Sequence, residues 1–298
     1  MVAGALLLGS IRLQAQSLAS PSTLEFGEVV VAPTGGSLTL DPATGAITGS
    51  TSVYPTSGLA TSASAIVATD RAKRTAYVYT TISSFTMSGP GGSFAVSPGP
   101  FYTEYPGDTF TFPGNRGNVS LTFHVGGTLA IPANQPAGDY TGVLPIFIQD
   151  NVGNNSNTVS LPIHIRLIAP IALNRTQDLD MGIVVPGSTS GSVTLNPTTG
   201  AQGVTGGVLY ASGTGQPALF SATGEPNHAF SVSLGSSTVS LAGPSGAMSL
   251  ALTASPSGLS TFNGSGTATV SLGGTLSVGA NQAEGDYLGT ISVTVAYP

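Results

Sequence analysis

Three histidines, thirteen carboxylates and no cysteine are the side chains from which this chain could build a reactive or metal-binding site. His124 and His164 fall in alternating apolar runs that predict strands, and His228 lies in a turn-like stretch. None of them has the spacing typical of metal ligands, and no G-x-S-x-G motif accompanies the many serines. The lack of cysteine excludes disulfides, thiolate metal sites and cysteine nucleophiles. We therefore expect no enzymatic activity, no cofactor and no bound metal.

Another candidate ion site lies in a sequence that occurs twice. Residues 126–142 read GGTLAIPANQPAGDYTG, and residues 273–289 read GGTLSVGANQAEGDYLG, 147 positions later. The Asn and Asp of each copy could offer oxygens to calcium, but the clustered carboxylates that hard cations prefer are missing. Asn and Gly also suit left-handed turn positions, and a tyrosine after such a corner can bond back to the loop. The motif therefore predicts a pinned turn between two strands.

The repetition extends over most of the chain. Leu24–Ala46 matches Leu179–Ala201, and short β-prone runs alternate with glycine- and proline-rich turns throughout. No stretch longer than about ten residues shows a helical period. The pattern predicts an all-β protein made of two tandem immunoglobulin-like β-sandwiches. We place the sandwiches at residues 21–168 and 169–298, after an N-terminal segment of residues 1–20.

Charged residues are rare in this chain and restrict its partners. They make up 7% of the sequence, whereas about 25% is typical of soluble domains. The net charge of −6 argues against a nucleic-acid partner, because a phosphate-binding face needs excess positive charge. The basic cluster within residues 70–74 is interpreted as a solvated loop or a guard on an edge strand. A surface of hydroxyl and amide groups favours a secreted or surface-exposed protein.

The first copy contains an extra strand at its end. Five apolar residues alternate there with polar ones and predict a half-buried closing strand. They are Val159, Leu161, Ile163, Ile165 and Leu167. The second copy ends with a similar alternating run, an expected acceptor strand. Its members are Ile291, Val293, Val295 and Tyr297. A sandwich without its closing strand exposes core side chains and unpaired edges, so we expect another segment to fill that position.

The motifs L-x-F/M-G near the start of each copy, G-D-Y-x-G before its last strand and a penultimate tyrosine together resemble a known group of proteins. They are similar to subunits of bacterial chaperone–usher pili, to spore-coat-protein-U-like surface proteins and to a related domain family of unknown function. The resemblance covers nearly the whole chain, although pilins usually carry a disulfide. It implies a pilin-like fold and an extracellular, cell-surface location. It also implies a structural role in a pilus, fimbria or filament built by donor-strand complementation.

That resemblance implies other copies or related subunits as partners, and periplasmic chaperone and usher machinery. The N-terminal segment is the candidate donor, because Ser10–Gly27 aligns with His164–Gly182. Ile11 and Leu13 then mirror two residues of the closing strand. The alternative is that residues 1–20 are a signal peptide, although its basic residue follows the apolar run instead of preceding it.

An insert in the first copy indicates a second possible class of function, ligand binding. Residues 97–114 carry five aromatic side chains where the second copy has a shorter, plainer segment. Phe101, Tyr102 and Tyr105 stand beside acidic residues and could stack on sugar rings or dock a protein. The alternative is that they pack over the end of the sandwich. The rival to a filament subunit is therefore a monomeric surface adhesin or lectin that binds a glycan or host protein through this insert.

Overall fold

The structure is a computed structural model, and it describes residues 17–298 apart from several short segments. These segments are residues 20, 32, 51–52, 56–63, 71–74, 81, 83, 97–100, 113–118, 151–155 and 212. The chain divides into two compact units, residues 1–168 (unit 1) and 169–298 (unit 2). Within the described residues the regular structure is all strand except for one 3-10 turn, η1 at Pro106–Asp108. The predicted fold class, an all-β chain of two tandem β-sandwiches, is confirmed.

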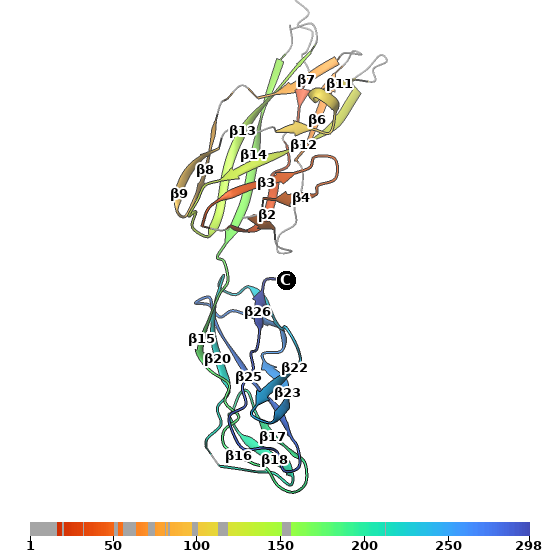
Figure 1. Cartoon of the computed structure of the whole chain (residues 1–298). Helices are drawn as coiled ribbons and strands as arrows, with labels where there is room; N and C mark the ends of the chain where they lie inside the picture. The colour runs from red at the N-terminus through yellow and green to blue at the C-terminus, as the bar shows by residue number, and fades with distance from the viewer. Residues whose placement is uncertain are drawn as a thin grey trace, which may run out of the picture. The chain divides into compact units, whose positions relative to one another are not determined.

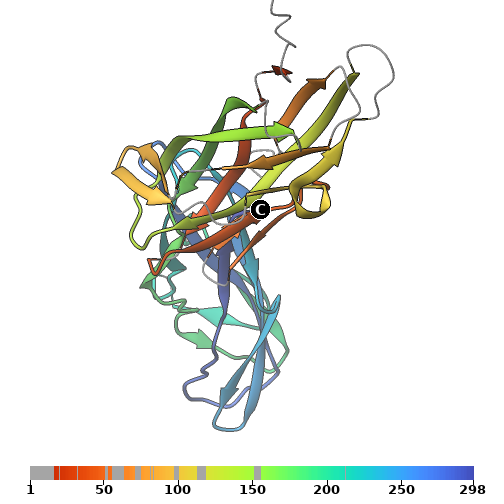
Figure 2. The ribbon, with the colours of Figure 1, turned by 90° about the horizontal axis from the view of Figure 1, so that it is seen from above.

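Unit 1 is built from two main sheets. Its strands are β1 Ser17–Leu18, β2 Leu24–Val31, β3 Gly36–Leu40, β4 Ile47–Gly49, β5 Val53–Pro55, β6 Ser64–Asp70, β7 Thr75–Tyr79, β8 Phe85–Gly89, β9 Gly92–Val96, β10 Tyr102–Thr103, β11 Thr109–Thr111, β12 Val119–Ile131, β13 Gly138–Asp150 and β14 Ser156–Ile168. One sheet has the order β1-β6-β12-β3-β4, and the other has the order β11-β7-β13-β14-β2-β5. Both views show β13 and β14 running side by side along the unit (Figures 1 and 2).

Unit 2 repeats much of this arrangement with shorter strands. They are β15 Ala172–Gln177, β16 Val184–Val185, β17 Gly191–Leu195, β18 Gln202–Gly206, β19 Leu209–Tyr210, β20 Ala218–Thr223, β21 Ala229–Leu234, β22 Thr238–Gly243, β23 Gly246–Ser255, β24 Gly258–Thr261, β25 Thr267–Val278 and β26 Val293–Ala296. The sheet β15-β20-β25-β17-β18 matches the first sheet of unit 1. The second sheet is split into the pieces β24-β21-β26 and β16-β19.

The repeated corner holds the same contacts in both units. The Tyr140 hydroxyl donates to the Pro136 carbonyl over 3.0 Å, and the Tyr287 hydroxyl donates to the Ala283 carbonyl over 2.9 Å. The glycines two residues before these tyrosines, Gly138 and Gly285, have φ values of 137° and 135°, which an L side chain rarely adopts. A Cβ on Gly138 would also lie 2.5 Å from the Cγ of Pro90, in the hairpin of β8 and β9. The predicted tyrosine corner is confirmed, and it locks this hairpin to the sandwich.

Candidate strand-acceptor site

The closing strand of unit 1 lies inside its second sheet. β14 pairs antiparallel with β13 from Gly138 to Gln149, and it pairs parallel with β2 on its other side. Its alternation sets four side chains into the core and leaves Val159 half-buried. The four are Leu161, Ile163, Ile165 and Leu167, each at most 2% exposed. β14 therefore completes both the hydrogen-bond ladder and the core of unit 1.

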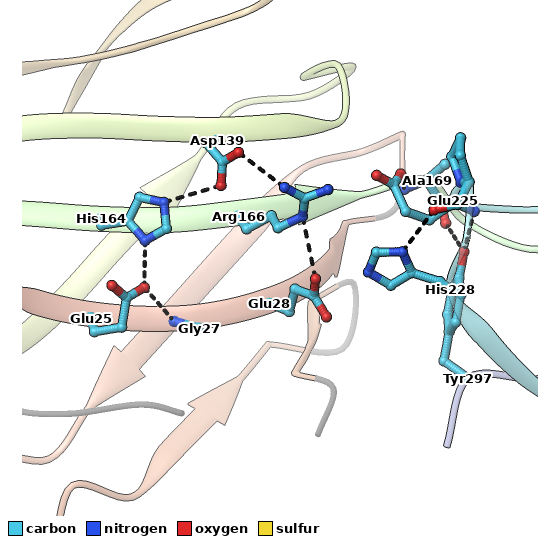
Figure 3. A network of polar contacts seen from close by, with 11 residues as sticks. Glu25, Gly27, Glu28, Asp139, His164, Arg166, Ala169, Glu225, His228 and Tyr297 are labelled. Atoms are coloured by element: carbon cyan, nitrogen blue, oxygen red, sulfur yellow. Dashed lines mark hydrogen bonds and ion pairs between the residues drawn. The ribbon is translucent and has the colours of Figure 1, made fainter. Parts of the chain in front are cut away.

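The polar face of β14 is held by carboxylates from both neighbouring strands (Figure 3). The two ring nitrogens of His164 lie 2.6 Å from Glu25 Oε1 and 3.1 Å from Asp139 Oδ1. Arg166 Nη1 donates to Asp139 Oδ2 over 3.0 Å, and Arg166 Nε lies 3.3 Å from Glu28 Oε1. Glu28 is only 8% exposed, so Arg166 compensates a carboxylate that water barely reaches. These contacts fix the register of β14 between β13 and β2.

No strand formed by the described residues occupies the equivalent position in unit 2. β26 corresponds to the end of β13, and it pairs only with β21 among the residues described in unit 2. β16 corresponds to part of β2, and it pairs only with β19. We call the space between residues 179–185 and 287–296 the acceptor position, because β14 fills the same position in unit 1.

Burial at the acceptor position differs from that in unit 1. Leu144, Ile146 and Ile148 of β13 are at most 3% exposed. Their equivalents in unit 2 are only half-buried. These are Ile291, Val293 and Val295. On the opposite border, Leu179 and Val184 are half-buried, whereas the equivalent Leu24 and Val29 of unit 1 are fully buried. Apolar surface that unit 1 covers with β14 is thus open in unit 2.

The expected acceptor strand is shorter than its sequence pattern indicated. The alternation runs from Ile291 to Tyr297, but the strand covers only Val293–Ala296. Strand structure persists where β21 supplies a partner, and it is absent at the residues whose equivalents in β13, Gly138–Pro145, pair with β14 but not with β7. Ile291 therefore borders the acceptor position outside the strand.

Tyr297 has a different role from the one its place in the alternation suggested. Its hydroxyl donates to the carbonyl of Ala169 over 2.6 Å and accepts the backbone N–H of Glu225 over 2.7 Å. Glu225 is 7% exposed, and its Oε2 accepts the N–H of Ala169 over 3.0 Å (Figure 3). Tyr297 thereby joins the first residue of unit 2 to the last stretch of β structure in that unit.

The apolar core of unit 2 is divided into two clusters, one at each border of the acceptor position. In unit 1, one continuous apolar cluster contains the inward side chains of β2, β13 and β14. In unit 2 there are two clusters. One contacts Leu179 and Val184 beside β16, and the other contacts Val293 and Val295 of β26. A strand at the acceptor position would place apolar side chains next to both clusters, whereas in unit 1 the side chains of β14 belong to the single cluster.

The borders of the acceptor position keep two of the three carboxylates that hold β14. Asp180 stands where unit 1 has Glu25, and Asp286 stands where it has Asp139. Ile183 replaces Glu28. Sequence reasoning had missed these acids as strand partners. Their shared positions in the L-E-F-G-E, L-D-M-G-I and G-D-Y motifs are the signal that could have revealed them.

The remaining sequence-predicted residues lie apart from this site. The donor candidates Ile11 and Leu13 are outside the described residues, as is most of the basic cluster. Phe101 and Tyr105 pack against the core of unit 1, and Tyr102 is half-buried in β10. The described aromatic residues of the insert therefore pack on unit 1, and their geometry favours the structural interpretation.

The histidines and acids of the described residues form no group of three or more that could hold a metal ion. His124 instead lies 3.0 Å from Glu104 Oε1, and Asp139 already contacts His164 and Arg166 of β14. Over the same residues, the structure contains no helix with the length and hydropathy of a membrane span.

Comparison with known families matches the chain twice to one family, described as a domain of unknown function (DUF4402), over residues 17–149 and 171–297. No curated protein matches the chain. Among solved structures, a chaperone–tip adhesin complex described as vital for activation of CFA/I fimbriae biogenesis shares 10% identity. That match covers 93% of this chain and 97% of that chain with a TM-score of 0.25. A likeness this small carries no argument about function.

Proposed function

The chain belongs to the DUF4402 family in both of its copies, and from this premise we propose that it is an exported structural subunit of a bacterial pilus-like or cell-surface filament. Its subunits assemble by donor-strand complementation, and its role is non-enzymatic. One observation carries the proposal. β14 fills a strand position in unit 1 that no described residue fills in unit 2.

The place of β14 in the chain supports assembly between molecules. β14 ends at Ile168, and β15, the first strand of unit 2, begins at Ala172. The strand that completes unit 1 is therefore the segment directly preceding unit 2. By the same relation, the segment directly preceding β1 completes unit 2 of another molecule. Such donation is a head-to-tail interface, which gives an open fibre when the rotation between successive molecules does not close a ring.

The free energy available at the acceptor position is sufficient for a long-lived contact. A donor like β14 would bury about five apolar side chains, each contributing roughly 1.5–3 kcal/mol before the cost of ordering the strand. It would also satisfy the unpaired backbone groups of two edges. The partners are other copies or related subunits, and a periplasmic chaperone of the usher type would protect the open position before assembly.

Deleting residues 1–20 should abolish fibre formation. The full chain is expected to form fibres visible by negative-stain electron microscopy, whereas the deleted chain should sediment as a monomer. Adding a synthetic peptide of residues 1–20 to the deleted chain should fill the acceptor position and raise the melting temperature of unit 2.

A peptide in which Ile11 and Leu13 are replaced by serine is the matched control, and it should bind far more weakly. Mass spectrometry of exported protein provides a second criterion. A mature N-terminus beyond residue 20 would make these residues a signal peptide and would remove the proposed donor. Monodisperse full-length particles would contradict the filament role.

The charges at the acceptor position provide a test of register. Arg12 aligns with Arg166, whose guanidinium contacts Asp139, and Asp286 is the equivalent of Asp139. Arg12→Glu or Asp286→Arg alone should slow fibre growth, and the double exchange should restore it. The effect should be at most about fivefold, because exposed ion pairs are weak. Equal growth rates in light scattering for all four proteins would refute this register.

A further inference from the structure

One face of unit 1 carries exposed aromatic side chains that the fold does not require. Tyr77 and Tyr79 alternate along β7 with the buried Ala76 and Val78, so they point outward, and they are 45% and 37% exposed. Phe147 of β13 lies directly opposite Tyr79 in the ladder. The Tyr79 and Phe147 rings are 5.6 Å apart, with planes only 19° from parallel. We call Tyr77, Tyr79 and Phe147 the aromatic platform.

Unit 2 shows what the same positions contain without a platform. The pairing of β26 with β21 places Ser231, Ser233 and Thr294 where unit 1 has the three aromatic residues. Hydroxyl side chains therefore suffice to build this sheet face in the same fold. Large apolar groups exposed to water without a structural need mark an interaction surface. The platform is thus a feature of unit 1 that the equivalent positions of unit 2 lack.

The described side chains that pair directly with the platform are polar and uncharged. Thr109 pairs with Tyr77 on one side, and Thr158 pairs with Phe147 on the other. The Tyr79 hydroxyl donates to Gln149 Oε1 over 3.4 Å. Among the described side chains of these rows, none carries a charge. The charged cluster of Glu25, His164 and their partners lies farther along the same sheet.

We propose that the aromatic platform binds a neutral polysaccharide. The π face of an aromatic ring is negative, so it attracts the weakly positive C–H groups on one face of a sugar ring. The two tyrosine hydroxyls, Gln149 and the threonines supply the donors and acceptors that sugar hydroxyls require. A flat sheet face suits an extended chain of sugars better than a single small molecule. The site is independent of filament assembly.

Affinity electrophoresis tests this binding. Native gels would contain hydroxyethyl cellulose, mannan or galactan as neutral probes, and alginate as the anionic comparison. At least one neutral probe should retard the parent chain, and alginate should not. The variant Tyr77→Ser, Tyr79→Ser, Phe147→Thr copies the residues of unit 2, and its dissociation constant should rise at least tenfold.

Two controls separate binding from folding and from general adsorption. Leu259→Ser removes a side chain that is 68% exposed in unit 2, and it should leave the dissociation constant unchanged. The single variant Tyr77→Ser should bind with an intermediate constant, and both platform variants should keep the circular dichroism of the parent. The chain has nine tyrosines and no tryptophan, so titration can also be followed by tyrosine emission.

Three outcomes would overturn the proposal. One is that no neutral probe retards the parent chain, and another is that the triple variant is retarded as strongly as the parent. The third is that the triple variant changes only the sedimentation of the protein, which would make the platform a contact between copies. The polysaccharide site is supported if a neutral probe retards the parent chain and Leu259→Ser but does not retard the triple variant.

Discussion

Appending residues 151–168 after Pro298 should raise the melting temperature of unit 2 by at least about 10 °C and should leave the protein monomeric. The added segment follows β26 as β14 follows β13, so it can fold back into the acceptor position as a hairpin. It would join the two separate apolar clusters of unit 2 into one. About five newly buried side chains contribute roughly 1.5–3 kcal/mol each, and ordering the strand offsets only part of this.

The control has the same length and a broken core face. In it, the appended equivalents of Leu161, Ile163 and Ile165 are serine, so that the segment can pair but cannot fill the core. Differential scanning calorimetry should show a raised transition only for the intact strand, and sedimentation should show fibres only for the parent and the serine control. If the intact strand changes neither property, unit 2 is already complete and donor-strand complementation is wrong.

Truncating the core face of β14 should destabilise unit 1 strongly. Leu161→Ala and Ile165→Ala each remove most of a side chain that is 0% exposed. Buried Leu→Ala and Ile→Ala changes cost about 2–5 kcal/mol, because the lost contacts leave a cavity. The thermal transition of unit 1 should therefore fall by many degrees, while that of unit 2 should stay in place.

The matched control for these changes is Ser160→Ala, on the exposed face of the same strand. It should alter the free energy of unfolding by less than about 0.5 kcal/mol, as surface changes usually do. Chemical denaturation followed by circular dichroism measures both effects. A loss under 1 kcal/mol for Leu161→Ala would show that β14 is a peripheral strand and not the closing element of the core.

The sequence predicted what depends on local pattern. Period-two alternation identified the strand at residues 159–167, and the repeated G-D-Y motif identified the corner that Tyr140 makes. It could not show that β14 lies parallel to β2, because that pairing joins segments more than 130 residues apart. The same limit hid the aromatic platform, whose residues come from two distant strands.

Other features could not be predicted because the alternation of apolar and polar residues shows which face of a strand is buried, but not which neighbour covers that face. It assigned Ile291 and Tyr297 to a strand without revealing which neighbour would pair with them. For the aromatic insert, both packing and ligand binding stayed open, because sequence alone does not show that Phe101 and Tyr105 rest on the core. The role of a carboxylate such as Glu28 is evident only in the structure, where Arg166 lies beside it.

The parallel pairing of β2 and β14 has a mechanical consequence. The chain enters β2 at Leu24, beside Ile163, and leaves β14 at Ile168, beside Val30. Once β1 has detached, tension along the chain pulls these two ends in opposite directions, parallel to the strands. The ladder between them is then loaded in shear, so that its hydrogen bonds resist together and do not open one after another. Unit 1 is thus built to bear a pulling force along its own backbone.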